Sequence, residues 1–252
     1  MGKRILVRRR GKAGLQWLAP KRGKISPVSY PSIDSSLTMG ATVAAILHER
    51  GRAAPLAKLQ LDNGTTCWIP AVSGLEQGQR ITIGPMAPPS TGNILPLSRI
   101  PEGTSVCNIE AHYGDGGKYV RVAGSSAIVF SQSGAKTVVK FPSGRSLFID
   151  SSARATVGIV AGGGRVEKPF LKAGNRLKYM RARGKAYPKV RGVAMAVVHH
   201  PFGGGRHQHP GKSTSTARMT PPGRKVGHIA PKRTGRGRAA RQQQQQQQQQ
   251  AK

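Results

Sequence analysis

The stretch Ala57-Lys-Leu-Gln-Leu-Asp-Asn-Gly-Thr-Thr-Cys-Trp-Ile69 decides the fold class of this chain. Apolar and polar residues alternate before the turn residues Asp62-Asn63-Gly64, and a strand-like run follows them. An Asn-Gly pair between two such runs is a strong short-range signal for a β-hairpin. The stretch therefore predicts antiparallel strands at residues 57–61 and 65–69, joined by a tight turn.

Short strand patterns of the same kind continue on both sides of this hairpin. The predicted strands are residues 42–47, 57–61, 65–69 and 80–83, then 105–110, 119–122, 127–131, 137–141, 146–149 and 155–160. Between the two groups, Pro85, Pro88, Pro89 and Pro96 predict a linker. Each group has the size of one small β-barrel, and such barrels often carry nucleic-acid-binding surfaces. Helix is scarce, and only Lys172–Arg183 predicts a short basic helix.

The charge of the chain is concentrated at its two ends. The 252 residues carry a formal charge of +32, of which residues 1–35 hold +8, residues 36–160 hold +4 and residues 161–252 hold +20. A charge of this size predicts a polyanionic partner, either nucleic acid or an anionic membrane, that neutralises it.

Charge and strand pattern together predict four parts. They are a basic N-terminal extension at 1–35, a first barrel at 36–86, a second barrel at 87–160 and a basic C-terminal extension at 161–252, which ends in the poly-glutamine run Gln242–Gln250. The expected fold class is mainly β, with two small barrels between long and largely irregular extensions. We expect residues 1–35 and 161–252 to become ordered only on RNA.

Several classes of protein are disfavoured by composition. No window approaches the roughly 20 apolar residues of a spanning helix, and no apolar segment follows the basic N-terminus as in a secretory signal. Cys67 and Cys107 lack C-x-x-C spacing, so we expect reduced, packed thiols rather than a disulfide or zinc framework. These features favour a cytosolic protein with no membrane partner.

The segment 187–210 combines aromatic, cationic, imidazole and glycine groups. Pro188, Pro201 and Pro210 forbid a continuous helix, while Gly203-Gly204-Gly205 allows the backbone to approach another surface closely. We therefore expect this segment to be ordered by a large polyanion.

Four histidines lie close together in the sequence: His199, His200, His207 and His209. They could bind zinc, act as a catalytic base or contact RNA. Structural zinc usually takes ligands from separated turns, often with cysteine, and nucleophilic catalysis needs an acidic orienting residue. The C-terminal region offers only Glu167 as an acid. RNA contact explains the same residues more economically, because imidazole and arginine stack on bases and arginine binds phosphate. No metal, cofactor or catalytic residue is therefore expected.

The order of many short motifs is more specific than composition. The motifs are Gly2-Lys-Arg-Ile5, Arg8-Arg9-Arg10-Gly11, Leu95-Pro-Leu97, Ile100-Pro-Glu-Gly103, Asn108-Ile-Glu110, Gly114-Asp-Gly-Gly-Lys118, Ala161-Gly-Gly-Gly-Arg-Val-Glu-Lys-Pro-Phe170, Ala173-Gly-Asn175, Pro188-Lys-Val-Arg-Gly-Val-Ala-Met195, His200-Pro-Phe-Gly-Gly-Gly205 and Pro222-Gly-Arg-Lys-Val-Gly227. Nearly the whole chain thus resembles the universal large-subunit ribosomal protein L-two family, in its archaeal or eukaryotic branch.

This resemblance implies an oligonucleotide-binding-type (OB-like) barrel, an SH3-like barrel and a C-terminal extension threaded into large-subunit rRNA toward the peptidyl transferase region. It implies a structural, non-enzymatic role in the cytoplasmic ribosome that supports rRNA architecture, subunit association and tRNA binding. The implied partners are large-subunit rRNA, neighbouring ribosomal proteins and the small subunit. His200 stands where the family has a histidine considered important for peptidyl transfer, and we interpret it as an RNA-positioning residue.

The sequence departs from the family pattern at three places. Ala196 stands where asparagine is usual, His199 stands where an acidic residue is usual, and Gln242–Gln250 has no counterpart. The change at His199 removes a negative charge that could have oriented His200, which further disfavours acid–base chemistry. A non-specific basic nucleic-acid packaging protein and a zinc-dependent enzyme remain the alternatives.

The residues predicted to contact RNA are cations, aromatic residues, histidines and glycines of the motifs and barrels. They are Arg4, Arg8, Arg9, Arg10, Arg50, Arg52, Arg80, Lys118, Arg121, Arg165, Lys168, Lys172, Arg176, Arg181, Arg183, Tyr187, Lys189, Arg191, His199, His200, Phe202, Gly203, Gly204, Gly205, Arg206, His207, His209, Arg224 and Lys225.

Overall fold

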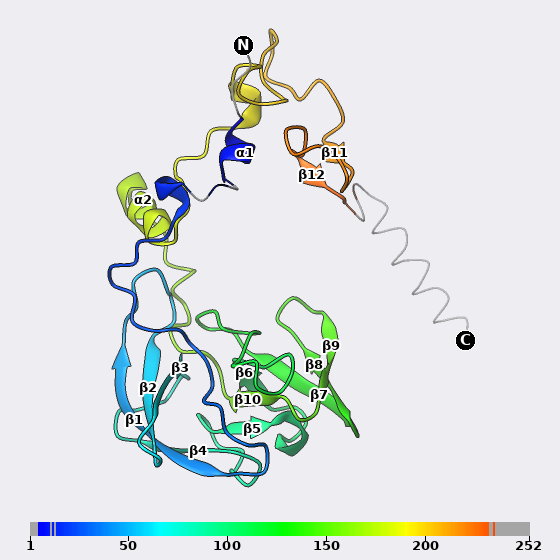
Figure 1. Cartoon of the computed structure of the whole chain (residues 1–252). Helices are drawn as coiled ribbons and strands as arrows, with labels where there is room; N and C mark the ends of the chain where they lie inside the picture. The colour runs from blue at the N-terminus through cyan, green and yellow to red at the C-terminus, as the bar shows by residue number, and fades with distance from the viewer. Residues whose placement is uncertain (1–4, 11, 13, 232–233, 235–252) are drawn as a thin grey trace, which may run out of the picture. The chain divides into compact units, whose positions relative to one another are not determined.

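The chain divides into two compact units. A computed structural model describes residues 5–10, 12, 14–231 and 234 (Figure 1). Residues 20–183 form one unit, called the sheet unit below. The described parts of residues 1–19 and 184–252 form the other, called the terminal unit.

The sheet unit contains almost all of the regular structure. Its elements are β1 (Met39–Leu47), β2 (Leu56–Leu61), β3 (Thr66–Pro70), β4 (Arg80–Ile83), β5 (Ile94–Pro96), the 3-10 helix η2 (Leu97–Arg99), β6 (Ser105–Cys107), β7 (Ala127–Ser133), β8 (Lys136–Lys140), β9 (Ser146–Asp150), β10 (Arg154–Val157) and α2 (Ala173–Ala182). The terminal unit contains α1 (Leu6–Arg10), the 3-10 helices η1 (Leu15–Trp17) and η3 (Gly192–Ala194), β11 (Ser215–Thr216) and β12 (His228–Ile229). None of the described helices has the length and apolar character needed to cross a membrane.

The hairpin predicted from the Asn-Gly turn is confirmed. Strands β2 and β3 pair antiparallel. Gly64 has a φ of +81°, in the left-handed region that glycine adopts without strain. The side-chain Oδ1 of Asn63 accepts a hydrogen bond from the Thr65 N–H at 3.0 Å. The turn is therefore specified by residues next to one another in the sequence.

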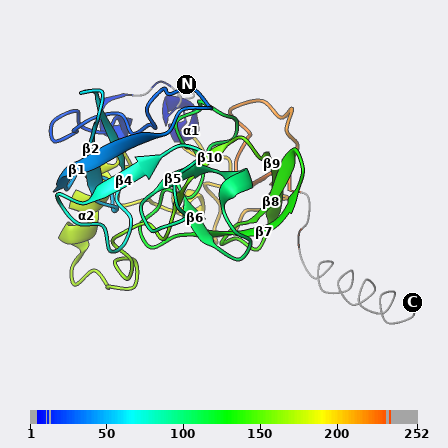
Figure 2. The same cartoon turned by 90° about the horizontal axis from the view of Figure 1, so that it is seen from below.

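The ten strands form one sheet in the order β3-β2-β1-β4-β5-β10-β6-β7-β8-β9. Neighbours pair antiparallel except β4 and β5, whose parallel contact at Ile83 and Ile94 joins the two halves. Figure 2 shows these two strands side by side. The mainly β class is confirmed, and the described strands form an open sheet whose edge strands are β3 and β9.

The sheet unit has two large hydrophobic cores and a third, smaller cluster formed by Ala54, Val72, Cys107, Ala123 and Val160. The first gathers residues from β1 to β4, and the second gathers residues from η2 and β6 to β10. Ile94 belongs to the first core and its neighbour Leu95 to the second, and both are fully buried. Because successive side chains of a strand point to opposite faces, β5 contributes one residue to each core. This three-residue strand therefore connects the two halves.

Two sequence predictions about strands are wrong. The proline-marked linker contains β5, which pairs with β4 and β10. Residues 119–122 are not a strand, because only Tyr119 makes a bridge, to Ile109, and Val120 has a φ of +54°. The predicted basic helix is confirmed as α2, Ala173–Ala182.

Part of the predicted N-terminal extension packs on the sheet. Tyr30 is buried in the first core, and its hydroxyl lies 2.6 Å from Thr156 Oγ1 on β10. The Ser29 N–H donates to the Trp68 carbonyl at 3.1 Å. Arg121 donates to the Val28 carbonyl at 2.9 Å. Packing on the sheet therefore begins before residue 35, and the expectation that residues 1–35 become ordered only on RNA is wrong for residues 28–30.

A buried ion pair between Glu110 and Arg154 holds this region together. Glu110 is fully buried, and only 5% of the Arg154 side chain is exposed. The Arg154 Nη2 and Nε atoms donate to Glu110 Oε1 and Oε2 at 2.8 and 3.1 Å. The Glu110 carboxylate also accepts backbone N–H groups of Gly116 and Arg154 at 2.9 and 3.0 Å. A buried charge pair is stable only when its remaining donors and acceptors are satisfied, and here they are.

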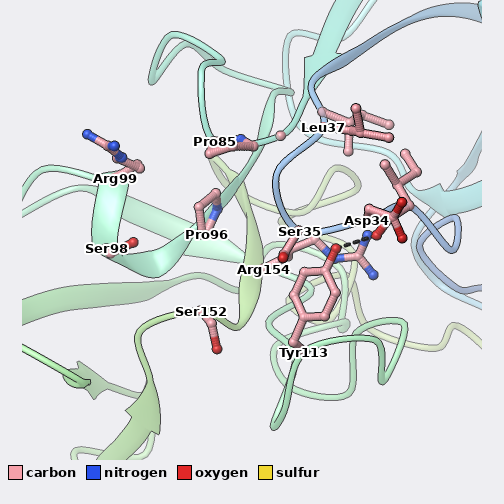
Figure 3. Close-up of a pocket in the computed structure, with 13 residues that line it drawn as sticks. Asp34, Ser35, Leu37, Pro85, Pro96, Ser98, Arg99, Tyr113, Ser152 and Arg154 are labelled. Atoms are coloured by element: carbon pink, nitrogen blue, oxygen red, sulfur yellow. Dashed lines mark hydrogen bonds between the residues drawn. The ribbon is translucent and has the colours of Figure 1, made fainter.

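The arginine also anchors the segment that precedes β1. Its Nη1 donates to the Pro31 carbonyl at 2.8 Å, and its guanidinium lies 4.8 Å from the centre of the Tyr113 ring. The Tyr113 hydroxyl donates to the Ile33 carbonyl. Figure 3 shows Tyr113 beside Arg154 at the edge of a cavity of about 280 Å³, which Asp34 and Ser35 also line.

We predict that Glu110→Gln destabilises the full chain by about 3–5 kcal/mol, because it leaves the Arg154 charge buried without its partner. Chemical denaturation followed by tryptophan fluorescence measures the loss. Arg80→Gln is the matched control, since Arg80 and Asp62 form an exposed pair, with 73% and 47% of their side chains exposed. The control should change stability by less than about 1 kcal/mol, and equal effects of the two variants would contradict this account.

The two cysteines are predicted to be unreactive in the folded chain. Burial raises the pKa of the Cys67 thiol to about 11 and that of Cys107 to about 12. Since the thiolate is the reactive form, iodoacetamide at pH 8 should label both slowly, and Cys107 more slowly than the less buried Cys67. Mass spectrometry of the native and the denatured chain measures the rates, and native labelling as fast as denatured labelling would contradict the prediction.

Candidate nucleic-acid interface

The segment around His200 is a closed loop in the terminal unit. It follows the 3-10 helix η3 and is held by three backbone hydrogen bonds, each 2.9–3.0 Å long. The His199 N–H donates to the Ala196 carbonyl, Gly203 to His200, and Gly204 to Met195. Residues 195–204 therefore form a compact turn whose shape depends on local backbone contacts.

Glycines permit this loop to close. Gly204 has a φ of +81°, and a Cβ at Gly203 would lie 2.4 Å from the Ala196 carbonyl oxygen. Since real Cβ atoms do not come so close, any other residue at 203 would push the two backbone segments apart. Two glycines of the Gly203-Gly204-Gly205 motif are thus explained within the chain, independently of a partner.

The imidazole of His200 is fixed by its neighbours. A Cβ at Gly192 would lie 2.3 Å from His200 Cε1, so the ring packs directly on this glycine. His200 Nδ1 accepts the Phe202 N–H at 3.0 Å, and the two rings lie 5.3 Å apart. Burial lowers the pKa of His200 below its ordinary value of 6.5, so the ring is neutral at neutral pH. With Nδ1 accepting, the proton resides on Nε2, which makes His200 a hydrogen-bond donor rather than a base.

His200 lines a cavity of about 590 Å³ within the terminal unit. Its apolar walls include Phe202 and Val226, and three cations, Lys189, Arg191 and Lys225, stand among them. No carboxylate is among the lining residues. The cavity combines aromatic, apolar and cationic groups in the way that suits RNA more than a metal ion.

The other three histidines do not gather around a common point. His199, His207 and His209 are exposed, whereas His200 is half-buried. In the part of the chain that the structure describes, no group of three or more His, Cys, Asp or Glu side chains could hold a metal ion. The geometry thus gives no support to the zinc alternative.

Eight of the predicted cations of the sheet unit fall into two groups. Arg80 and Lys118 pair with Asp62 and Asp115, each at 2.9 Å. Arg121 donates to two backbone carbonyls at 2.9 Å, and burial lowers its pKa. These three side chains already have partners within the fold.

The second group is drawn together near α2. Two cavities that share four lining residues bring together the predicted residues Arg50, Arg52, Arg165, Lys168 and Arg183. Arg50 and Arg183, which are 133 positions apart in the sequence, thereby line the same cavity, which no local sequence pattern could show.

The remaining predicted residues are scattered over both units. Arg8, Arg9 and Arg10 lie on α1, and Arg176 and Arg181 lie on α2, which Lys172 precedes. In the terminal unit, Tyr187 precedes Pro188 through a cis peptide bond, Gly205 and Arg206 follow the His200 loop, and Arg224 precedes Lys225. Arg4 and the Gln242–Gln250 run lie outside the described residues.

Sequence reasoning missed several residues that shape these sites. Gly192 supports the His200 ring, and Phe170 and Tyr179 lie edge to face at 5.4 Å beside the clustered cations. Phe170 and Tyr179 are nine residues apart in a strongly basic segment, and this spacing was the only sequence signal for their contact. The spacing alone could not predict the contact, because the contact depends on where α2 begins.

Comparison with known proteins identifies the family. Residues 90–224 match the family model described as Ribosomal Proteins L2, C-terminal domain. The chain is 50% identical over 236 residues to the large ribosomal subunit protein uL2 of Desulfurococcus amylolyticus, covering 94% of this chain and 99% of that protein. It is 51% identical over 241 residues to the protein of the same name from Pyrobaculum calidifontis, covering 94% and 96%.

The chain belongs to the uL2 family. The resemblance inferred from the ordered motifs is therefore confirmed, in its archaeal type, and a further relative from Korarchaeum cryptofilum is 49% identical over 94% of the chain. The matched uL2 segment includes the second core, α2 and the His200 loop. The His200 loop and α2 thus lie within the part of the chain that the family model matches.

We predict that Gly192→Ala raises the pKa of His200 toward 6.5, because the added Cβ displaces the ring and thereby reduces the burial that lowers this pKa. The lowered pKa means that the neutral ring stabilises the loop above pH 6.5 and that this stabilisation is lost as the pH falls through the folded-state value. NMR titration of the His200 imidazole in the full chain measures the shift.

Gly223→Ala is the matched control, since a Cβ at Gly223 meets nothing within 4 Å. The control should leave the His200 titration unchanged. A native His200 pKa at or above 6.5, or equal titration in both variants, would show that the ring is not held in this way.

Proposed function

We propose that this chain is a structural constituent of the large ribosomal subunit and binds large-subunit rRNA. The observation that carries the proposal is about 50% identity, over 94% of the chain, to proteins named large ribosomal subunit protein uL2. The same names support a ribonucleoprotein with a role in translation, and we propose that the chain acts there as a structural protein rather than as an enzyme.

The physical properties of the terminal unit support an RNA partner. Residues 1–19 and 184–252 contain 20 Lys and Arg side chains and no Asp or Glu. Among the described residues of this unit, Val226 is the only apolar side chain that is buried. A segment that buries so little apolar surface and repels itself so strongly gains stability chiefly from a polyanion.

The proposal extends to the organisation of the chain. We propose an OB-like module at 36–86, which supplies most of the first core, and an SH3-like module at 87–160, which supplies the second. Residues 1–35 and 161–252 are the basic extensions, of which residues 28–33 pack on the sheet unit, and we propose that the cations of the remaining parts contact RNA.

We further propose a finer role for the His200 loop, which the family resemblance suggests. A neutral, fixed imidazole that donates from Nε2 can position RNA at the peptidyl transferase region and support tRNA binding without taking part in proton transfer. Neighbouring ribosomal proteins and the small subunit, across the subunit interface, are the further partners, which places the chain in the cytoplasmic ribosome.

The affinity for rRNA should fall steeply with salt. For about 6–10 phosphate contacts, duplex-based arithmetic predicts a loss of about 10³- to 10⁵-fold between roughly 50 and 200 mM salt, because counterions are released on binding. Filter binding of the full chain to a large-subunit rRNA fragment across this range measures the slope.

Unrelated RNA of equal length serves as the competitor in the same assay. At matched salt, it should displace the rRNA fragment only at a large excess. Equal competition would favour the non-specific packaging protein, and a nearly flat salt response would contradict both the packaging and the ribosomal functions.

A further inference from the structure

Two adjoining cavities lie beside α2 in the sheet unit, with volumes of about 400 and 310 Å³. They share Arg165, Phe170, Asn175 and Tyr179 as lining residues. The other lining residues come mainly from the segment between β1 and β2 (His48, Arg50, Gly51, Arg52 and Ala53) and from the segment before α2 (Val166, Lys168, Pro169 and Leu171). We call this space the α2 groove.

The α2 groove has a strong surplus of positive charge. Five permanent cations line it and no carboxylate does: Arg50, Arg52, Arg165, Lys168 and Arg183. The adjacent Glu49 is buried and already pairs with Lys24 at 2.9 Å and Arg52 at 3.5 Å. Its charge is therefore neutralised within the fold, and the groove remains selective for an anion.

The wall between residues 48–53 and α2 is fixed by close packing. Gly51 has a φ of +89°, and a Cβ at this position would lie 2.6 Å from the Ala182 carbonyl oxygen. Arg183 Nε donates to the Gly51 carbonyl at 3.0 Å. The geometry of the groove is therefore set before any ligand binds.

An aromatic pair adds a second kind of recognition. The rings of Phe170 and Tyr179 meet edge to face, with centres 5.4 Å apart and planes at 61°. The Arg183 guanidinium lies 3.8 Å from the Tyr179 ring centre, so one face of this ring is occupied. Phe170 is 48% exposed and offers its ring to a ligand in the groove.

We propose that the α2 groove binds one unpaired RNA nucleotide, with its base against Phe170 and its flanking phosphates on Arg50 and Arg165. This inference rests on the proposed function, because it names the form of RNA that this site takes. A flat ring among cations matches a base and its phosphates, since bases stack on aromatic side chains and arginine binds phosphate through paired donors.

A duplex or an acidic peptide fits the groove less well. Bases in a duplex are stacked on each other, so a duplex would use the cations and leave Phe170 unused. An acidic peptide offers carboxylates but no flat ring. Only an unpaired nucleotide uses both features of the groove.

Photocrosslinking tests the site directly. The full chain is irradiated with a short single-stranded RNA that carries one 5-iodouridine, and mass spectrometry maps the crosslinked residue. The expected crosslink is at Phe170 or Tyr179, and annealing the RNA to its complement should remove it. Crosslinks elsewhere only, or equal crosslinking of the duplex at these residues, would overturn the proposal.

Substitution of the ring provides a second test. Phe170→Leu keeps an apolar side chain but removes the stacking surface, and should lower the crosslink yield at Tyr179 by about 5-fold or more. Phe148→Leu is the matched control, because Phe148 on β9 is 75% exposed and is not among the lining residues of the groove. Equal yields in the two variants would overturn the stacking role of Phe170.

Competition separates this proposal from its alternatives. A polyglutamate peptide that removes the groove crosslink at the same concentration as unlabelled single-stranded RNA would assign the groove to an acidic protein partner instead. Failure of the ribosomal function appears differently, as a lack of preference for large-subunit rRNA with the groove crosslink intact.

Discussion

The buried pair of Glu110 and Arg154 is the interaction on which the sheet unit depends. One carboxylate receives the guanidinium and two backbone N–H groups, and the same guanidinium reaches the Pro31 carbonyl. Because β10 lies between β5 and β6, this pair ties the segment before β1 to the middle of the sheet. Two buried charges are costly to desolvate, so the site is stable only as a complete set, and it fixes how the two cores are joined.

The sheet unit and the terminal unit are stabilised in different ways. The sheet unit buries two cores and pairs several of its cations internally, as the contacts of Arg80, Lys118 and Arg121 show. The terminal unit has no acidic residue, and its described part buries little apolar surface, so glycine-dependent turns such as the His200 loop provide its local order. The proposed rRNA partner would neutralise its charge and add to its stability.

Elements that are specified by residues close together in the sequence could be predicted, whereas contacts between residues far apart in the sequence could not. The hairpin at Asp62-Asn63-Gly64 and the helix α2 were predicted because their determinants lie within a few residues. Strand β5 was missed since prolines surround it and its pairing partners are distant in sequence. Of the candidate site, the His200 segment and the individual cations were proposed from composition and motifs, whereas the gathering of the cations beside α2 was not. The support of His200 by Gly192 and the contact of Phe170 with Tyr179 were not, because they depend on tertiary packing.

Sedimentation of the chain with ribosomal subunits tests the central claim most directly. A lysate that contains the tagged full chain is separated on sucrose gradients in moderate salt and again after a high-salt wash, and the chain is followed against large-subunit rRNA. The account predicts that the chain migrates with the large subunit under both conditions, because its contacts with rRNA are numerous and specific. Migration as free protein or with DNA under both conditions would contradict it.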